Sequence, residues 1–152
     1  MTRKTARQIA VQLLFSMETN ALSPEEAADL FFSEEHYSSL QEEDLIFEEE
    51  ADKKSEAYIR RLIESVSVHQ AELDEIIGRY AKDWKTNRLS TATRTILRVC
   101  LCEILYFDDV PDSAAVNEAV ELGKTFDSPE AASFINGVLG SFLRTEKPEK
   151  AK

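Results

Sequence analysis

The chain has 152 residues, 43% of them hydrophobic, and a formal net charge of −11. That size and composition suit one folded domain with a real core and exclude a disordered chain. Four glycines and four prolines favour long helices over a turn-rich β-sandwich. No apolar run approaches the roughly 18 residues of a membrane helix, and the apolar stretch from Ile9 to Met17 is too interrupted for a signal peptide. We therefore expect a cytoplasmic protein without a membrane segment.

The negative charge is concentrated in one segment. Residues 21–57 contain 13 acidic and 2 basic residues, whereas the rest of the chain contains 16 of each. An acidic protein does not present its whole surface to nucleic acid. A local basic site remains compatible with this distribution.

In chain order, apolar residues recur at the 3–4 spacing of helices with one buried face. Serine–proline pairs at Ser23-Pro24 and Ser128-Pro129 indicate helix starts, because serine caps and proline suits the first turn. The predicted helices are Thr5 to Asn20, about Pro24 to Phe32, Glu49 to Val68, about Glu72 to Tyr80, Ser90 to about Phe107, Asp112 to about Phe126 and Ser128 to Leu143. The acidic stretch from Ser33 to Glu50 is predicted to be a loop, alone or with a short helix.

No stretch shows the alternation of a β-strand, so the predicted fold class is all-α, a bundle of six to seven helices. Glu103 lies inside the most apolar of these helices and is expected to need a cationic partner, such as Arg98, Arg94 or a lysine elsewhere. The two cysteines, Cys100 and Cys102, are interpreted as reduced core residues.

Nothing in the sequence predicts catalysis, a metal site or a cofactor. The histidines and cysteines do not fall at a zinc-site spacing, and the acidic run from Glu42 to Glu50 is typical of a solvated face. The glycines form no nucleotide-binding turn. Gly137 and Gly140 match the GxxG spacing of an RNA-clamping loop, but their apolar flanks favour a helix packed closely on a neighbour. We therefore expect a protein that is not an enzyme.

Two groups of basic residues are candidate phosphate-binding sites. Arg3, Lys4 and Arg7 precede any acidic residue and lie at the start of the first predicted helix, where cations and backbone N–H groups point the same way. A solubilising terminus is the alternative interpretation. The second group can bind RNA, bind an acidic partner or pair internally with the acidic segment. It comprises Arg79, Lys82, Lys85, Arg88, Arg94 and Arg98.

Two stretches resemble the NusB family. Ala6 to Phe15 is similar to the arginine-rich opening of the family's first helix. The second resemblance is longer and keeps the family's order and spacing. It comprises Arg94 to Arg98, Glu103 to Leu105, Val110-Pro111, Ala115 to Lys124 and Phe134 to Leu139. The middle of the chain, roughly Ser33 to Asp83, does not carry the resemblance.

The resemblance implies two packed three-helix bundles within one domain, about 5–68 and 70–143, with a frayed tail over 144–152. It also implies a bacterial transcription antitermination factor that binds boxA RNA of ribosomal RNA operons. The implied partners are the ribosomal protein called NusE in this role and the RNA polymerase antitermination complex.

Family positions imply an RNA-binding set and a NusE-binding set of residues. The RNA-binding set is Arg3, Lys4, Arg7, Lys124, Ser133 and Phe134. The NusE-binding set is Phe15, Glu18, Thr93 and Arg94. The chain departs from the family at Thr93, where an acidic residue is common, at Thr5, where another arginine is common, and at Gly123, where alanine is usual.

Two other functions compete with this interpretation. A protein-binding scaffold would use the acidic segment as its interface, and a related helical module begins certain ribosomal RNA cytosine methyltransferases. The chain has no Rossmann-like segment, so a free-standing factor is favoured. The sequence does not determine the oligomeric state, and a monomer is the working expectation.

Overall fold

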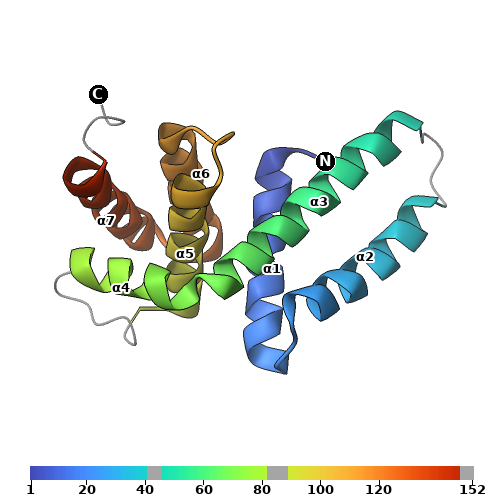
Figure 1. The fold of residues 1–152 in the computed structure, drawn as a ribbon, viewed down its shortest axis with the longest axis horizontal. Helices are drawn as coiled ribbons and strands as arrows, with labels where there is room; N and C mark the ends of the chain where they lie inside the picture. The colour runs from blue at the N-terminus through green and yellow to red at the C-terminus, as the bar shows by residue number, and fades with distance from the viewer. Residues whose placement is uncertain (41–45, 82–88, 148–152) are drawn as a thin grey trace. The chain divides into compact units, whose positions relative to one another are not determined.

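The computed structural model describes the backbone of residues 1–40, 46–81 and 89–147, and the side chains of 1–33, 53–81 and 89–147. Over these residues the chain forms seven α-helices and no β-strand, which confirms the all-α class (Figure 1). The helices are α1 (Arg3–Asn20), α2 (Pro24–Leu40), α3 (Ile46–Val68), α4 (Gln70–Tyr80), α5 (Thr91–Tyr106), α6 (Asp112–Phe126) and α7 (Pro129–Glu146). None of the described helices is long and apolar enough to span a membrane. The chain divides into two compact units, Met1–Ser67 and Val68–Lys152.

Unit 1, residues 1–67, contains α1, α2 and α3, and side-chain caps fix the starts of α1 and α2. The Thr2 hydroxyl accepts a hydrogen bond from the Thr5 N–H at 3.1 Å, so α1 begins at Arg3, two residues earlier than predicted. Ser23 and Glu26 form a reciprocal capping box at the start of α2, with bonds of 3.0 and 3.1 Å. The hydrogen bond from the Ser23 backbone N–H to the Glu26 carboxylate, followed by the influence of the nearby Ser23 hydroxyl, lowers the pKa of the Glu26 carboxyl.

The prediction of a loop from Ser33 was wrong for residues 33–40, because α2 continues to Leu40. The helix α3 likewise begins at Ile46 and not at Glu49. Neither stretch contains a glycine or proline, the residues that most strongly interrupt a helix. Acidic composition alone is therefore a poor sign of a loop. The middle of the expected loop, residues 41–45, lies outside the described residues.

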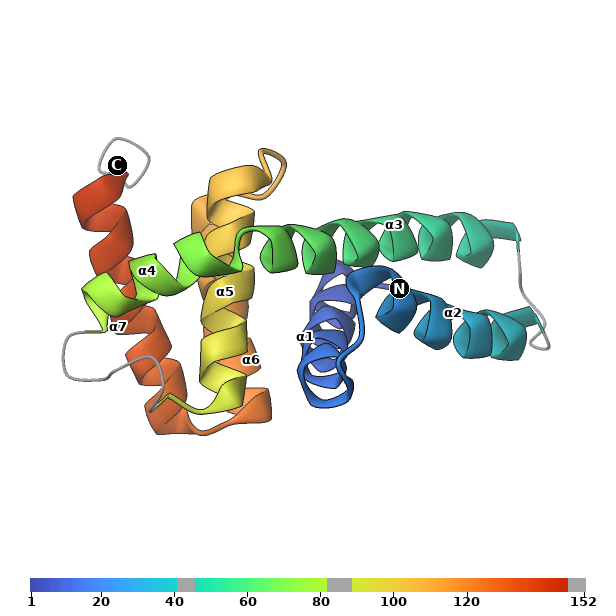
Figure 2. The same cartoon turned by 60° about the horizontal axis from the view of Figure 1, so that its bottom comes forward.

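Unit 2, residues 68–152, is organised around α5, α6 and α7. The helix α6 packs against both α5 and α7, and α4 crosses α5 and α7 (Figures 1 and 2). The helix α5 is buried at almost every position from Thr93 to Ile104. Buried residues of the other three helices in this unit include Leu73, Ile77, Leu122, Ile135, Leu139 and Phe142.

Polar contacts hold α4 on α5. The Arg98 guanidinium donates two hydrogen bonds to the Asp74 carboxylate, at 2.7 and 2.9 Å. The Tyr106 hydroxyl donates to Glu72, which together with burial raises the pKa of Tyr106 to about 12. The His69 ring stacks on the Tyr106 ring with centroids 3.9 Å apart. Arg98, one of the cations considered as a partner for Glu103, is therefore bound to Asp74. Glu103 itself is buried, with 1% of its surface exposed.

Helix α7 approaches α6 closely at Gly123. A Cβ atom at Gly123 would lie 2.9 Å from Ile135 Cδ1 and 3.1 Å from the Ala132 Cα atom of α7. Because real Cβ atoms are almost never that close to a neighbour, the missing side chain allows α7 to approach α6. Gly123 is thus a packing feature of this chain.

The two glycines of the GxxG pair, in contrast, are not in close contact with another helix. Gly137 and Gly140 lie inside α7 and not in a loop. A Cβ atom at Gly137 would meet nothing within 4 Å, and one at Gly140 would meet only the Arg144 side chain. The prediction of a packed helix in place of an RNA-clamping loop is confirmed, because the flanking residues Ile135, Val138 and Leu139 are buried.

We expect Gly123→Ala and Gly137→Ala to change stability in opposite directions. Alanine gains about 1 kcal/mol of helix propensity at either position. At Gly123 overpacking against Ala132 and Ile135 costs about 1–3 kcal/mol and exceeds this gain. Urea denaturation should therefore show a lower free energy of unfolding for Gly123→Ala and a higher one for Gly137→Ala. Equal stabilisation by both would contradict the close approach at Gly123.

Candidate nucleic-acid interface

The first turn of α1 carries two of the three predicted N-terminal RNA-binding cations on its surface. Arg3 and Lys4 are exposed. Arg7 is only 5% exposed, so its side chain contributes mainly to the interior of the fold. The structure therefore favours Arg3 and Lys4 as the phosphate-binding members of this group.

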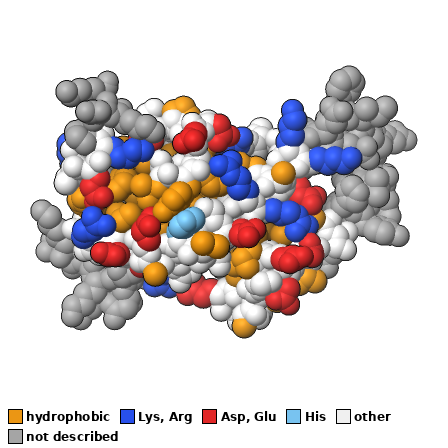
Figure 3. Space-filling model, viewed as in Figure 1, with side chains coloured by type: hydrophobic (Ala, Val, Ile, Leu, Met, Phe, Trp, Pro, Cys, Tyr) orange, Lys and Arg blue, Asp and Glu red, His pale blue; other side chains and the backbone are white. Residues whose placement is uncertain are grey.

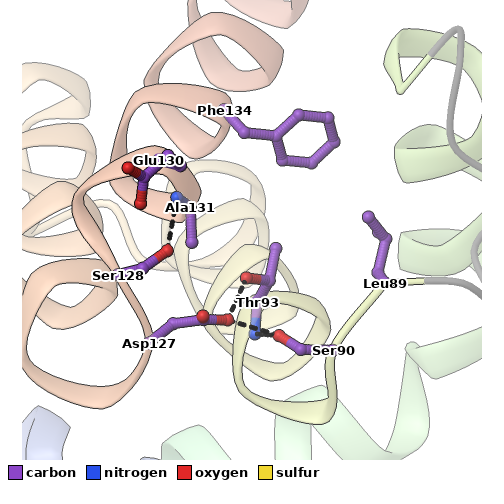
Figure 4. Close-up of a pocket in the computed structure, with 8 residues that line it drawn as sticks. All are labelled: Leu89, Ser90, Thr93, Asp127, Ser128, Glu130, Ala131 and Phe134. Carbon is purple, nitrogen blue, oxygen red and sulfur yellow. Dashed lines mark hydrogen bonds between the residues drawn. The ribbon is translucent and has the colours of Figure 1, made fainter.

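A pocket of about 330 Å³ lies where α5 and α7 begin (Figure 4). Two serine caps form its rim: the Ser90 hydroxyl accepts from the Thr93 N–H, and the Ser128 hydroxyl accepts from the Ala131 N–H, both at 3.0 Å. The Phe134 ring points into the space opposite Leu89. The eight lining residues are Leu89, Ser90, Thr93, Asp127, Ser128, Glu130, Ala131 and Phe134.

Asp127 joins the two helix starts that form the pocket. Its Oδ2 atom accepts hydrogen bonds from the Thr93 hydroxyl at 2.9 Å and from the Ser90 hydroxyl at 2.5 Å. Asp127 ends α6 and directly precedes the Ser128 cap of α7. One carboxylate therefore ties the α6–α7 turn to the first turn of α5.

Of the three other predicted RNA-binding residues, Phe134 lines this pocket and two lie on the surface. Ser133 is exposed on α7. Lys124 is exposed near the end of α6, with its Nζ atom 3.4 Å from Glu121 Oε1. Such a surface pair contributes little, so it does not prevent Lys124 from binding phosphate. The structure thus brings Phe134 into a pocket and leaves Lys124 and Ser133 accessible in the same unit.

The predicted NusE-binding residues differ in accessibility. Glu18 is exposed, whereas Phe15 and Arg94 are half-buried. Thr93 is only 4% exposed, and its hydroxyl donates to Asp127. Thr93 therefore supports the turn of α6 and α7, and its contact with NusE stays a prediction.

Two arginines of the second basic group, Arg79 and Arg98, form ion pairs within unit 2. Arg79 binds Glu146 at 3.0 Å, and Arg98 binds Asp74. These carboxylates belong to α7 and α4, so of the three alternatives the pairing with the acidic segment 21–57 does not apply to these two arginines. Lys82, Lys85 and Arg88 lie outside the described residues.

Sequence reasoning found Phe134 but missed most of the pocket, including Asp127, Glu130 and Leu89. The Ser128-Pro129 pair had indicated one helix start, and another helix had been predicted to begin at Ser90. The sequence does not show that the starts of α5 and α7 lie side by side, because that arrangement depends on the tertiary fold. Among the described residues, no group of three or more His, Cys, Asp or Glu side chains is placed to hold a metal ion.

These features define a small all-helical protein of seven described helices, with a basic helix start in one unit and a pocket between two helix starts in the other. The profile of the NusB family matches residues 4–144. The chain belongs to the NusB family.

Two relatives extend this assignment across nearly the whole chain. The transcription antitermination protein NusB of Symbiobacterium thermophilum is 39% identical over 147 residues, covering 97% of this chain and 92% of that protein. The protein of the same name from Pelotomaculum thermopropionicum is 37% identical, covering 99% and 93%.

Solved structures agree with the fold. T. maritima NusB superposes with a TM-score of 0.75 at 24% identity and covers 99% of this chain and 97% of its own. A chain from a complex of the antitermination factors NusB and NusE with double-stranded RNA gives a TM-score of 0.73 at 22% identity, covering 93% and 96%. At these identities the likeness supports the fold alone.

We expect the Thr93–Asp127 hydrogen bond to be measurable as a coupling energy. Thr93→Val keeps the shape and removes the hydroxyl, and Asp127→Ala removes its acceptor. A double-mutant cycle in urea denaturation should give a coupling of about 1 kcal/mol.

The matched control for this cycle is Thr95→Val, a buried threonine on the same helix whose hydroxyl is not bonded to Asp127 in the structure. Its cycle with Asp127→Ala should give no coupling. Equal coupling of Asp127 to both threonines would contradict the specific link between α5 and the α6–α7 turn.

Proposed function

We propose that the protein is a non-enzymatic RNA-binding factor in transcription antitermination, which binds boxA-type RNA together with NusE. The observation that carries the proposal is membership of the NusB family over residues 4–144, with relatives named transcription antitermination proteins that match almost end to end. A solved complex of NusB and NusE with RNA supports the choice of partners.

The charge distribution supports a factor that binds RNA weakly by itself. The net charge is −11, and the first turn of α1 offers only Arg3 and Lys4 as exposed cations. Because each neutralised phosphate releases counterions, binding through few cations is weak and strongly dependent on salt. A basic partner such as NusE would supply further contacts, so the pair should bind more tightly than either protein.

The pocket in unit 2 supports contact with an unpaired base. Phe134 offers an aromatic face of the kind on which single-stranded bases stack. The hydroxyls of Ser90 and Ser128 lie at the rim of the same space and can meet base edges. Phosphate contacts to Lys124 would then hold the strand, while base contacts in the pocket would select its sequence.

The remaining parts of the proposal follow from this role. Contacts with NusE would involve Phe15, Glu18, Thr93 and Arg94, and the complex would act with RNA polymerase in the cytoplasm. A single domain acting as a monomer is sufficient for one RNA and one NusE molecule. No metal or cofactor is required.

We expect boxA-containing RNA to bind weakly to the protein alone and severalfold more tightly when NusE is present. Fluorescence anisotropy at two salt concentrations, with a scrambled RNA as control, measures both effects. Affinity should fall steeply with salt, with a slope of about 0.7 in log–log units for each phosphate contact. Equal affinity of the NusE complex for boxA and scrambled RNA would contradict the proposal.

The double variant Arg3→Glu, Lys4→Glu tests where the RNA binds. Acidic residues in the first turn interact favourably with the helix dipole. We therefore expect α1 to stay folded while RNA binding is lost. The control is Arg144→Glu, an exposed charge reversal near the end of α7. Unchanged RNA binding by the double variant would favour a protein-binding scaffold.

A further inference from the structure

The first turn of α1 rests on the side of α3. The Arg3 guanidinium lies over the Tyr58 ring, 3.9 Å from its centroid. The Ser55 hydroxyl donates a hydrogen bond to the Met1 carbonyl at 3.4 Å. Ser55 and Tyr58 are 9% and 7% exposed, so they form a covered floor beneath the N-terminal residues.

Helical geometry places two further cations on the same edge of α3. Lys54 and Arg61 are seven residues apart and so differ by only about 20° around the helix. Tyr58 lies four residues after Lys54 and three before Arg61, within the spacing of side-chain neighbours. Lys54 and Arg61 are both exposed, so they flank the aromatic ring on which Arg3 is stacked.

Lys53 belongs to a different edge of α3. It lies three residues before Glu56 and seven before Arg60, which bind each other at 3.0 Å. Arg60 also binds Asp29 of α2 at 2.8 Å, so this edge lies toward α2. Lys53 and Lys54 are the only basic residues in the acidic segment 21–57, yet the fold separates them onto two edges.

We propose that the RNA-binding surface continues from the first turn of α1 onto α3, with Lys54 and Arg61 as additional phosphate-binding residues and Tyr58 as a positioning residue for Arg3. This inference rests on the proposed RNA-binding function. In the view of Figure 3, lysine and arginine side chains are spread over the face with acidic side chains between them, so the extension onto α3 is argued from the contacts of Arg3 and Tyr58.

The stacked arrangement suits phosphate recognition. A guanidinium stacked on an aromatic ring uses its flat face, while its N–H groups point outward along its edges in a geometry that matches phosphate. Holding Arg3 in this orientation before RNA binds reduces the side-chain entropy lost on binding. Tyr58 therefore acts through Arg3 and need not touch RNA itself.

The test compares Lys54→Gln with Lys53→Gln, a matched pair of neutralisations one residue apart. Each complex with NusE is titrated with boxA-containing RNA across a salt series. Lys54→Gln should weaken binding about fivefold near 0.1 M salt and lower the salt slope by about 0.7, the value for one phosphate contact on a single strand. Lys53→Gln should change neither quantity, since Lys53 lies toward α2.

Substitutions that keep or remove the aromatic ring of Tyr58 test whether this ring positions Arg3. Tyr58→Phe keeps the ring and should leave affinity unchanged, whereas Tyr58→Leu should weaken binding to the level of Arg3→Gln. The double variant Tyr58→Leu, Arg3→Gln should be no weaker than Arg3→Gln alone. A purely structural role for Tyr58 would instead give additive losses, and circular dichroism checks that each variant is folded.

The outcomes separate this inference from the proposed function. If the wild-type chain with NusE binds boxA RNA and Arg3→Gln weakens it, equal behaviour of Lys54→Gln and Lys53→Gln overturns the inference and leaves the function standing. If the wild-type complex does not bind, both are overturned. A selective loss in Lys54→Gln supports the extension onto α3.

Discussion

The approach of α7 to α6 at Gly123 sets the geometry of the candidate site in unit 2. With no side chain at Gly123, the backbone of α7 at Ala132 comes within 3.1 Å of where a Cβ atom would lie. That contact fixes the turn between the two helices, and the turn carries Asp127 and the Ser128 cap. Asp127 then binds Ser90 and Thr93 on α5, and the space left between the helix starts is the pocket that Phe134 lines.

Charge is separated along this chain, and the separation makes the proposed RNA binding compatible with an acidic protein. The acidic segment 21–57 carries all the excess negative charge. The first turn of α1 carries exposed cations and no acidic residue, and an aromatic ring on α3 orients one of them. A few well-placed cations favour specificity and dependence on a partner over affinity, since most binding energy to nucleic acid scales with the number of phosphates neutralised.

Much of the fold follows from local patterns. Apolar spacing and serine–proline starts predicted six to seven helices, and the structure shows the expected serine caps at Ser23 and Ser128. The error at residues 33–40 arose because an acidic stretch without glycine or proline can remain helical. The candidate site was harder to predict, because burial of Arg7, stacking of Arg3 on Tyr58 and the bond from Thr93 to Asp127 all depend on residues distant in sequence. No local pattern encodes such pairs.

The central claim is that RNA contacts the first turn of α1 and the pocket between the starts of α5 and α7. Amide chemical shifts of the 15N-labelled protein, recorded in complex with unlabelled NusE as boxA RNA is added, test it most directly. The account predicts the largest shifts at residues 3–7 and 127–134. Shifts confined to other helices, with both of these segments unmoved, would contradict it.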